Sequence, residues 1–427
     1  MKVLVLGSGG REHALAWALS RSSSVGEVIC APGNPGMATL GETVACAIDD
    51  PLDVVRLTRD TRPDLVVVGP ELPLVNGLAD HLREERVAVF GPSRAAARIE
   101  GSKTYAKALM ERAQIPTAAW REFGEPEDAI RYLDELGPPY VIKADGLAAG
   151  KGVVVTAERD EAVRAVNERL VERRFGAAGA TIVIEEFLDG EEASLIAFSD
   201  GTRVLACEPA QDYKRALDGD AGPNTGGMGS YSPVPACPAD LAQQIVTEVM
   251  EPMIKQSAAE GAPFVGALYA GVALTSKGPK VVEFNARFGD PETQALLPRL
   301  RSDLGEVALA AAAGELDGTA LEWSREACVC LVLASSGYPG AYEMGYEITG
   351  LDRAGVMENV LVFHSGTQAA GDRVVTSGGR VLAVSAIGAS FAVARRRAYA
   401  AAEVIEFQGK HVRGDIALRA EQSEEAL

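Results

Sequence analysis

Short apolar runs and amphipathic segments alternate along the first hundred residues. Lys2–Leu6 and Leu65–Val68 have the length and the apolar composition of buried strands. Glu12–Ser20 and Val75–Glu85 carry the apolar spacing of helices that cover such a sheet. Because strands that alternate with helices form parallel sheets, residues 1–101 are predicted to form an N-terminal α/β domain.

The middle of the chain mixes both patterns and predicts an α+β domain over residues 102–324. Its first helix is expected at Ser102–Ala113, with the leading serine as N-cap. Residues 120–192 alternate strand and helix patterns and are predicted to form a smaller lobe. A long polar, glycine-rich loop is expected over Gln211–Pro235, followed by one helix over Ala239–Glu260.

Residues 325–420 are rich in strand patterns and predict a β-rich C-terminal domain that closes with a helix at Ser390–Glu406. Residues 421–427 are expected to be a frayed tail. Cys328 and Cys330 share one face of an expected strand, and no second cysteine pair completes a metal site. We interpret both as core thiols of a protein in a reducing compartment.

Charge and hydropathy exclude several classes of partner. The 427 residues contain 60 acidic and 41 basic side chains, a formal net charge of −19. This balance argues against nucleic acid or an anionic membrane as the main partner. No apolar run approaches the roughly 20 residues of a membrane-spanning helix. The apolar start of the chain runs at once into a glycine-rich turn, which predicts a first strand rather than a signal peptide, and we expect a cytoplasmic protein.

The segment Lys143–Val153 places a glycine-rich loop between two apolar runs. Its glycines allow the backbone to approach phosphate oxygens, and its lysines supply positive charge. It departs from a Walker A motif, because three residues separate Gly146 from Gly150 and Gly152 stands where a serine or threonine belongs. The segment therefore predicts a phosphate-binding loop of another nucleotide-binding architecture; an ordinary glycine-rich hairpin is the alternative.

A second glycine-rich turn, Gly7–His13, lies between a strand and a helix, which is the geometry that binds phosphate at a helix N-terminus. It imitates the dinucleotide fingerprint, but Glu12 stands where the third glycine belongs. The domain is therefore also suited to a sugar phosphate.

Two further segments carry groups that suit a nucleotide and a substrate. Val183–Glu192 is an expected strand that ends in carboxylates, and taken alone it indicates no more than a strand and a turn; its backbone and Glu191 would suit an adenine edge and ribose hydroxyl groups. Asp212–Arg215 and Gly222–Gly229 place an acid, two cations and several glycines in one long loop. That combination suits a substrate with both a phosphate and an amine.

The sharpest motif is Glu283–Gln294. Glu283 and Asn285 are two residues apart on an expected strand and so share one face. Carboxylate and amide oxygens suit Mg²⁺, a hard ion that binds together with phosphate groups. Arg287 continues the same face and suits a phosphoryl group or a carboxylate. A salt-bridged strand edge is the alternative interpretation.

Together these motifs resemble those of the ATP-grasp superfamily and, within it, the phosphoribosylamine–glycine ligase (glycinamide ribonucleotide synthetase) family. The resemblance implies a pre-ATP-grasp, Rossmann-like N-terminal domain, an ATP-grasp core and a strand-rich C-terminal domain. It extends from Gly7–His13 to Gly378–Leu382, and its most specific pieces are Ala31–Gly36, Gly69–Leu74, residues 143–153, Gly222–Pro233 and Glu283–Gln294.

The resemblance also implies a reaction. ATP, glycine and 5-phospho-β-D-ribosylamine would give glycinamide ribonucleotide, ADP and phosphate through a glycyl phosphate, in de novo purine biosynthesis. Phosphoryl transfer of this kind depends on positioning and charge neutralisation rather than on a covalent nucleophile. Mg²⁺ or Mn²⁺ is the expected metal, and the enzyme is expected to be a monomer that binds neither nucleic acid nor membrane.

Matching positions in the family's motifs imply roles for individual residues. The expected ATP contacts are Lys103, Lys143, Gly146, Gly150, Lys151, Gly152, Glu185, Glu186, Phe187, Leu188 and Glu191. The expected metal ligands are Glu283 and Asn285. The expected catalytic residues, which also contact substrate, are Asp212, Lys214 and Arg287. The remaining contacts expected with glycine or the phosphosugar are Gly9, Gly10, Asn34, Gly69, Pro70, Glu71, Asn224, Gly226 and Asp290.

One position departs from the family pattern. The family usually has histidine after the aspartate in the string Asp-His-Lys-Arg, and Tyr213 stands there. Tyrosine keeps a ring and a hydrogen-bonding tip but titrates far from neutrality. We therefore interpret Tyr213 as a residue that positions its neighbours and takes no part in proton transfer.

Three alternative functions stay open from the sequence. Another ATP-grasp carboxylate–amine ligase or a carboxylase has the same fold, although Gly222–Pro233 and Glu283–Gln294 disfavour both. The N-terminal domain suggests a dinucleotide oxidoreductase, but the broken glycine fingerprint and the metal-type strand argue against it. A nucleotide-sensing protein without turnover is disfavoured by the intact set Lys143, Glu283, Asn285 and Arg287.

Overall fold

Residues 1–101 form an α/β domain around a parallel sheet. The computed structural model describes residues 1–148, 152–174 and 176–425 of the chain. The elements of this domain are β1 (Lys2–Gly7), α1 (Gly10–Ser20), β2 (Glu27–Pro32), a 3₁₀ turn (Met37–Thr39), β3 (Glu42–Thr43), α2 (Pro51–Thr61), β4 (Leu65–Val68), α3 (Glu71–Val75), α4 (Leu78–Glu84), β5 (Val89–Phe90) and α5 (Arg94–Gly101). The strands lie parallel in the order β3-β2-β1-β4-β5, with the apolar β1 and β4 buried at the centre.

The helix predicted over Val75–Glu85 is wrong in its bounds. The structure has two helices there, α3 and α4, which are separated at Gly77. Gly77 has a φ of +92°, a left-handed conformation that ends the first helix and that glycine adopts without strain.

The small lobe is an antiparallel sheet with two helices. Its elements are β6 (Trp120–Phe123), α7 (Pro126–Leu136), β7 (Tyr140–Ala144), β8 (Val153–Thr156), α8 (Arg159–Leu170), a 3₁₀ turn (Gly176–Gly179) and β9 (Ile182–Glu186), with the strands in the order β6-β9-β7-β8. It has an apolar core of its own, which includes Leu133, Ile142 and Ile184. The preceding helix α6 (Lys103–Arg112) is capped as predicted, since the Ser102 hydroxyl accepts the Tyr105 N–H at 3.1 Å.

The large lobe is built on a four-stranded sheet in the order β11-β10-β16-β17. Its elements are β10 (Glu191–Asp200), β11 (Val204–Ala206), the hairpin β13 (Arg215–Leu217) and β14 (Ala221–Asn224), α9 (Ala239–Ile245), a π-helical turn (Val246–Met250), α10 (Glu251–Ala259), β16 (Val265–Thr275), β17 (Gly278–Asn285), α11 (Glu292–Leu296), a 3₁₀ turn (Leu297–Arg299) and α12 (Leu304–Ala313). The single helix predicted over Ala239–Glu260 is thus interrupted by the π turn. Pro252 explains this break, because it has no N–H with which to continue the α-helical pattern.

The C-terminal region is built on an antiparallel sheet that takes in two strands from the middle of the chain. Its elements are β12 (Gln211–Asp212), β15 (Gly229–Ser232), β18 (Ala327–Ser335), α13 (Leu351–Gly355), β19 (Val360–His364), β20 (Thr367–Ala370), β21 (Arg373–Thr376), β22 (Arg380–Gly388), α14 (Phe391–Val404), β23 (Lys410–His411) and α15 (Leu418–Glu425). The main sheet is antiparallel in the order β12-β15-β18-β22-β19, and β23 also pairs with β18. Cys328 and Cys330 are fully buried on β18.

Two predictions for this region are wrong. Gln211–Pro235 is not one long loop, because β12 and β15 pair with each other and β15 pairs with β18. Of the predicted frayed tail, residues 421–425 belong to the helix α15, and residues 426–427 lie outside the described part of the chain. A carboxylate oxygen of Glu424 accepts the Phe391 N–H at 2.8 Å, and Glu421 pairs with Arg395, so α15 is fastened to α14.

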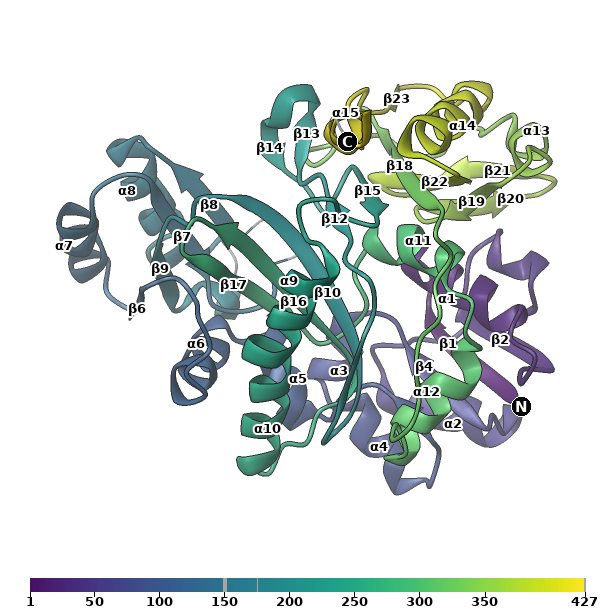
Figure 1. The fold of residues 1–427 in the computed structure, drawn as a ribbon, viewed down its shortest axis with the longest axis horizontal. Helices are drawn as coiled ribbons and strands as arrows, with labels where there is room; N and C mark the ends of the chain where they lie inside the picture. Colours follow the sequence, from purple (N-terminus) through teal and green to yellow (C-terminus); the bar gives the residue numbers. More distant parts are fainter. Residues whose placement is uncertain (149–151, 175, 426–427) are drawn as a thin grey trace.

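The small lobe, marked by α7 and α8, lies at one end of the molecule, while the N-terminal domain and the C-terminal sheet lie together at the other end (Figure 1). The large lobe, with β10, β16 and β17, connects them. In the described part of the chain, no helix combines the length and the apolar character that a membrane crossing requires.

Candidate active site

Strand β17 presents the two expected metal ligands side by side. Glu283 and Asn285 are half-buried on one face, and Phe284 between them is buried on the other. Burial by itself would raise the pKa of the Glu283 carboxyl group, yet neighbouring cations hold this pKa below its usual range. These cations, in order of effect, are Lys214, Lys143, Lys103 and Arg287. The Glu283 carboxylate is therefore charged and lies where several positive side chains converge.

A divalent ion fits these donors together with a nucleotide. Within residues 1–148, 152–174 and 176–425, no three or more His, Cys, Asp and Glu side chains are grouped as a metal cage. Mg²⁺ typically binds one or two carboxylates and completes its shell with phosphate oxygens and water. Glu283 and Asn285 would hold such an ion through one carboxylate and one amide oxygen.

Two lysines from different elements converge on one carboxylate oxygen of Glu185 on β9. Lys143 of β7 donates to Glu185 Oε2 at 2.9 Å and to the Val282 carbonyl oxygen at 3.0 Å. Lys107 of α6 lies 3.1 Å from Glu185 Oε2, and burial lowers the pKa of its ammonium group to about 8. Glu185 Oε1 is buried, and no donor among the described residues reaches it. The cluster therefore offers an unused acceptor to a ligand, next to two cations.

The glycine-rich loop is anchored to the start of α6. The Asp145 carboxylate accepts hydrogen bonds from the Thr104 N–H at 2.7 Å and from the Ser102 hydroxyl at 3.1 Å. Lys103 Nζ lies 3.4 Å from the Gly146 carbonyl oxygen, and burial lowers the pKa of this lysine. The lysine that the family resemblance assigns to ATP is thus fixed at the beginning of the loop.

Two glycines of this loop, Gly146 and Gly152, have no room for a side chain. A Cβ added at Gly146 or Gly152 would lie 2.6 Å from the Cβ of a neighbouring alanine, so both positions require glycine. Gly150 and Lys151, two of the predicted ATP contacts, lie outside the described residues.

The segment that joins β9 to β10 holds the other predicted nucleotide contacts. Glu186 pairs with Lys280 of β17 at 2.8 Å, and Glu191 lies 3.6 Å from an arginine of α15. Between them Phe187 is 48% exposed and Leu188 is half-buried. Phe187 therefore presents an exposed aromatic ring two residues after Glu185, the carboxylate that the two lysines share.

Asp212 on β12 and Lys214 form a second charged centre. Lys214 Nζ pairs with Glu192 Oε2 of β10. Although burial opposes it, the carboxylates of Glu192 and Asp212 raise the pKa of Lys214 above its ordinary value. Burial raises the pKa of Asp212 to about 8, although the charge of Lys214 acts in the opposite direction. The carboxyl group of Asp212 therefore holds its proton to a higher pH than an exposed aspartate does.

Two hydroxyl groups orient a further carboxylate beside this centre. Tyr269 donates its O–H to Glu292 Oε1 at 2.9 Å, and Ser194 Oγ lies 3.0 Å from the same oxygen. All three side chains are buried. Glu292 lies inside the motif Glu283–Gln294, which was the signal that could have identified it. Glu192 likewise ends the motif Val183–Glu192, whereas local sequence offered no such signal for the other residues that were missed, which are Glu100, Lys107, Ser194 and Tyr269.

Arg287 is held by two carboxylates from the N-terminal domain. Its Nη2 lies 2.9 Å from Glu100 Oε1, and its Nε lies 3.3 Å from Glu71 Oε2. Burial raises the pKa of Glu100. Burial would also raise the pKa of Glu71, but the charges of Arg287 and Arg11 lower it to about 2. Arg287 therefore connects the β17 site to the predicted substrate turn at Glu71.

The first glycine-rich turn closes around the carboxylate of Glu12. Glu12 accepts the Gly9 N–H at 2.7 Å and pairs with Arg11 Nε at 2.6 Å. A Cβ added at Gly69, next to Pro70, would collide with Glu12 Oε1. Glu12, which breaks the dinucleotide fingerprint, therefore fills the space between the turn at Gly9 and the turn at Gly69. A side chain at either glycine would collide with it.

The side chain of Asn34 is fully engaged within the protein. Its Nδ2 donates to the carbonyl oxygens of Ser8 at 2.9 Å and His364 at 3.0 Å. Its Oδ1 accepts the N–H groups of Gly36 and Met37, each at 3.0 Å. These bonds use both donors and both acceptor sites of the amide. Asn34 thus ties the first domain to the C-terminal sheet, and its side chain offers no free group for the predicted substrate contact.

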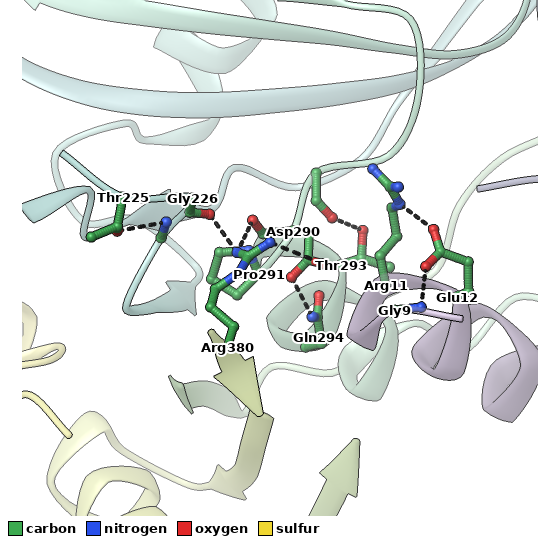
Figure 2. Close-up of polar contacts among 12 residues, drawn as sticks. Gly9, Arg11, Glu12, Thr225, Gly226, Asp290, Pro291, Thr293, Gln294 and Arg380 are labelled. Atoms are coloured by element: carbon green, nitrogen blue, oxygen red, sulfur yellow. Dashed lines mark hydrogen bonds and ion pairs between the residues drawn. The ribbon is translucent and has the colours of Figure 1, made fainter. Parts of the chain in front are cut away.

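Asp290 and Gly226 are brought together by an arginine of the C-terminal sheet. Arg380 Nη1 donates to the carbonyl oxygens of Asp290, at 2.8 Å, and of Gly226 (Figure 2). Gln294 Nε2 donates to Asp290 Oδ1 at 2.7 Å. Asn224 lies half-buried at the end of β14, two residues before Gly226. The predicted substrate contacts on these two loops are therefore neighbours in space.

Tyr213 points into the C-terminal region. Its ring lies 4.8 Å from the guanidinium of Arg413, and its hydroxyl accepts the Ala417 N–H at 3.0 Å. Burial raises the pKa of Tyr213 to about 12. These contacts support the interpretation that Tyr213 positions β12 and takes no part in proton transfer.

Replacing Tyr213 by phenylalanine is expected to lower the free energy of unfolding by about 1–3 kcal/mol, because the buried Ala417 N–H loses its acceptor. The turnover number is expected to change by less than about threefold, since no proton of the reaction passes through this hydroxyl. Thermal unfolding and steady-state rates of the two proteins test both statements. A Tyr213→His variant with greatly raised turnover would contradict the positional role.

Comparison with known proteins places the whole chain. Models of the N, ATP-grasp (A) and C domains of phosphoribosylglycinamide synthetase match residues 1–100, 101–293 and 328–419. The phosphoribosylamine–glycine ligase of Mesorhizobium japonicum is 49% identical over 426 residues, and that of Salmonella typhi is 48% identical over 429 aligned positions; both alignments cover 100% of each chain.

Solved structures agree with this placement. The crystal structure of phosphoribosylamine–glycine ligase from Thermotoga maritima is similar with a TM-score of 0.85 and 35% identity, covering 98% of this chain and 100% of that one. A biotin carboxylase from Campylobacter jejuni has a TM-score of 0.74 at 14% identity, covering 96% of this chain and 92% of that one, which shows a shared fold. The chain therefore belongs to the phosphoribosylglycinamide synthetase family of ATP-grasp ligases.

Proposed function

We propose that this protein joins glycine to 5-phospho-β-D-ribosylamine with cleavage of ATP, giving glycinamide ribonucleotide, ADP and phosphate in de novo purine biosynthesis. The observation that carries the proposal is the convergence of four cations on the carboxylate of Glu283, next to Asn285 on β17. That charge balance suits a site for phosphates and a reacting carboxylate. Membership of the family supports the identity of the two substrates. A cytoplasmic monomer is part of the proposal.

In the first step, glycine attacks ATP. Lys103 and Lys143 bind phosphate oxygens of ATP, and Arg287 orients the glycine carboxylate so that one oxygen attacks the γ-phosphorus. Mg²⁺ or Mn²⁺, when bound at Glu283 and Asn285, neutralises charge on the phosphates. The products of this step are ADP and glycyl phosphate.

In the second step, the amine of phosphoribosylamine attacks the acyl carbon of glycyl phosphate, and inorganic phosphate leaves. The attacking nitrogen loses one proton as the amide bond forms. Asp212 accepts this proton, and Lys214 stabilises the departing phosphate, since both side chains lie in one charged centre. Asp290 and Gly226 hold the phosphosugar from the facing loops.

Phosphate release from MgATP tests the reaction. The assay contains glycine and phosphoribosylamine generated in situ, and each component is omitted in turn. Release that requires both glycine and phosphoribosylamine is expected. Release that is unaffected by glycine would refute the proposal and would indicate an ATP-grasp ligase that activates a different acid. Release that requires bicarbonate instead of glycine would identify a carboxylase. No release with any pair would indicate a binding protein.

The pH dependence of the rate tests Asp212. Because burial raises the pKa of Asp212 to about 8, the carboxylate that accepts the proton becomes abundant only as the pH rises through that value. We therefore expect kcat to increase with pH and to level off above about 8. Asp212→Asn is expected to be slower at every pH and to lack this limb. An unchanged profile in the variant would exclude Asp212 as the proton acceptor.

A further inference from the structure

The C-terminal region holds both loops of the predicted phosphosugar site through two residues that have no assigned role. The Gly226 N–H donates to the Tyr338 hydroxyl at 3.0 Å, and the Gly226 carbonyl oxygen accepts from Arg380. Arg380 also donates to the Asp290 carbonyl oxygen at 2.8 Å, and its Nη2 lies 3.3 Å from Asp290 Oδ2. One guanidinium group therefore fixes the backbone of both loops and the carboxylate of one of them (Figure 2).

The two loops face the first glycine-rich turn. A Cβ added at Gly9 would lie 3.8 Å from Asp290 Oδ2, and a Cβ added at Gly10 would lie 2.7 Å from Gln294 Nε2. The N-terminus of α1, the predicted phosphate site, therefore lies beside the carboxylate of Asp290. An unpaired carboxylate there would repel a phosphosugar, because like charges in a partly buried site are weakly screened. The charge of Arg380 prevents this repulsion. Burial by itself would raise the pKa of Asp290, but the charge of Arg380 lowers this pKa below its usual value.

Close packing in the C-terminal region holds Arg380 and Tyr338 next to Gly226. A Cβ added at Gly379 would collide with the ring of Tyr338, so the start of β22 and the tyrosine pack directly on each other. A Cβ added at Gly226 would lie 3.1 Å from Arg380 Cζ, so the guanidinium packs closely against this glycine. Arg380 and Tyr338 therefore reach Gly226 together from one surface.

We propose that Arg380, assisted by Tyr338, is a positioning residue through which the C-terminal region sets the affinity for the phosphosugar and leaves the affinity for ATP unchanged. The inference rests on the proposed function. Arg380 acts through Asp290 and Gly226, so its loss changes the geometry and the charge of the acceptor site. The lysine cluster at Glu185 and the metal ligands on β17 have no contact with it among those described above.

The test compares Arg380→Lys, which keeps the charge, with Arg380→Gln, which removes it. Losing hydrogen bonds to a charged group costs about 1.5–3 kcal/mol, so KM for phosphoribosylamine is expected to rise about tenfold in the lysine variant and up to about a hundredfold in the glutamine variant. KM for ATP is expected to stay within about twofold in both variants. An equal rise in KM for ATP, or an unchanged KM for phosphoribosylamine, would overturn the inference.

Arg395 of α14 offers a matched control. Like Arg380 it donates to two backbone carbonyl oxygens, at 2.7 and 3.1 Å, and pairs with a carboxylate, but all of its partners lie in the C-terminal region. Arg395→Lys is expected to lower thermal stability and to leave both KM values unchanged. If Arg395→Lys raises KM for phosphoribosylamine as much as Arg380→Lys does, the effect is one of general stability and the inference fails.

Two further measurements keep the inference testable. If the Arg380 variants do not fold, Tyr338→Phe removes only the acceptor of the Gly226 N–H and is expected to raise KM for phosphoribosylamine by about two- to fivefold; no rise would overturn the inference. If the wild-type protein shows no turnover, the proposed function fails by itself. Calorimetric binding of ribose 5-phosphate then tests Arg380 directly, with at least tenfold weaker binding expected for Arg380→Gln and equal binding as the refuting result.

Discussion

Replacing Glu283 by glutamine is expected to lower kcat for glycine-dependent phosphate release by about a thousandfold, or about 4 kcal/mol of transition-state stabilisation. Glutamine keeps the shape and one oxygen of the side chain, so the change removes only the charge. That charge balances Lys214, Lys143, Lys103 and Arg287, and it is the one carboxylate of the proposed metal pair. Without it, the metal is held by neutral amides and the lysines repel one another.

Rates measured over a range of Mg²⁺ concentrations test this expectation. The variant is expected to need more Mg²⁺ and to stay slow even at saturation. Glu421→Gln is a suitable control, because Glu421 is also partly buried, at 21% side-chain exposure, and pairs with an arginine on α14 far from β17. A Glu283→Gln enzyme that keeps more than a tenth of the wild-type kcat would exclude Glu283 as the metal carboxylate.

Arg287→Gln is expected to remove activity and stability together. The arginine lies 2.9 Å from Glu100 and 3.3 Å from Glu71, and its side chain is 18% exposed. Removing one partner of a buried ion pair leaves an uncompensated charge and costs about 3–5 kcal/mol of unfolding free energy. The turnover number is expected to fall at least about a hundredfold, because the glycine carboxylate loses its orienting cation.

A second substitution separates the two effects. Glu100→Gln added to Arg287→Gln removes one uncompensated carboxylate, while the glutamine oxygen still accepts the Ala286 N–H that Glu100 accepts at 2.7 Å. The double variant is expected to regain much of the stability, as measured by denaturant unfolding, and none of the activity. Recovery of turnover in the double variant would show that Arg287 serves only to neutralise Glu100.

Local patterns predicted the elements whose geometry depends on near neighbours. The period of two along a strand placed Glu283 and Asn285 on one face, and β17 has them there. The serine cap of α6 and the strand–loop–strand arrangement around Lys143 were predicted for the same reason. Each of these features depends on residues a few positions apart, whose relative placement is fixed by the strand or helix itself.

Predictions were wrong where a distant segment decides the structure. Gln211–Pro235 has the polar, glycine-rich composition of a loop, yet β15 within it pairs with β18, about a hundred residues later. Residues 421–425 are polar and charged, but α14 provides partners for Glu421 and Glu424. Composition describes what a segment would do alone, whereas pairing with a remote strand or helix changes its free energy.

The sequence by itself determined the family, the succession of an α/β, an α+β and a strand-rich region, and the chemical types gathered in each motif. Only the tertiary structure decided which charges meet. Lys107 and Lys143 share Glu185, Arg287 lies between Glu71 and Glu100, and Arg380 reaches Asp290. These pairs join segments far apart along the chain, and packing of the domains brings them together. Burial then strengthens each pairing and shifts the pKa values of these groups. A charge removed from water loses its hydration, so its stability depends on the few groups that surround it.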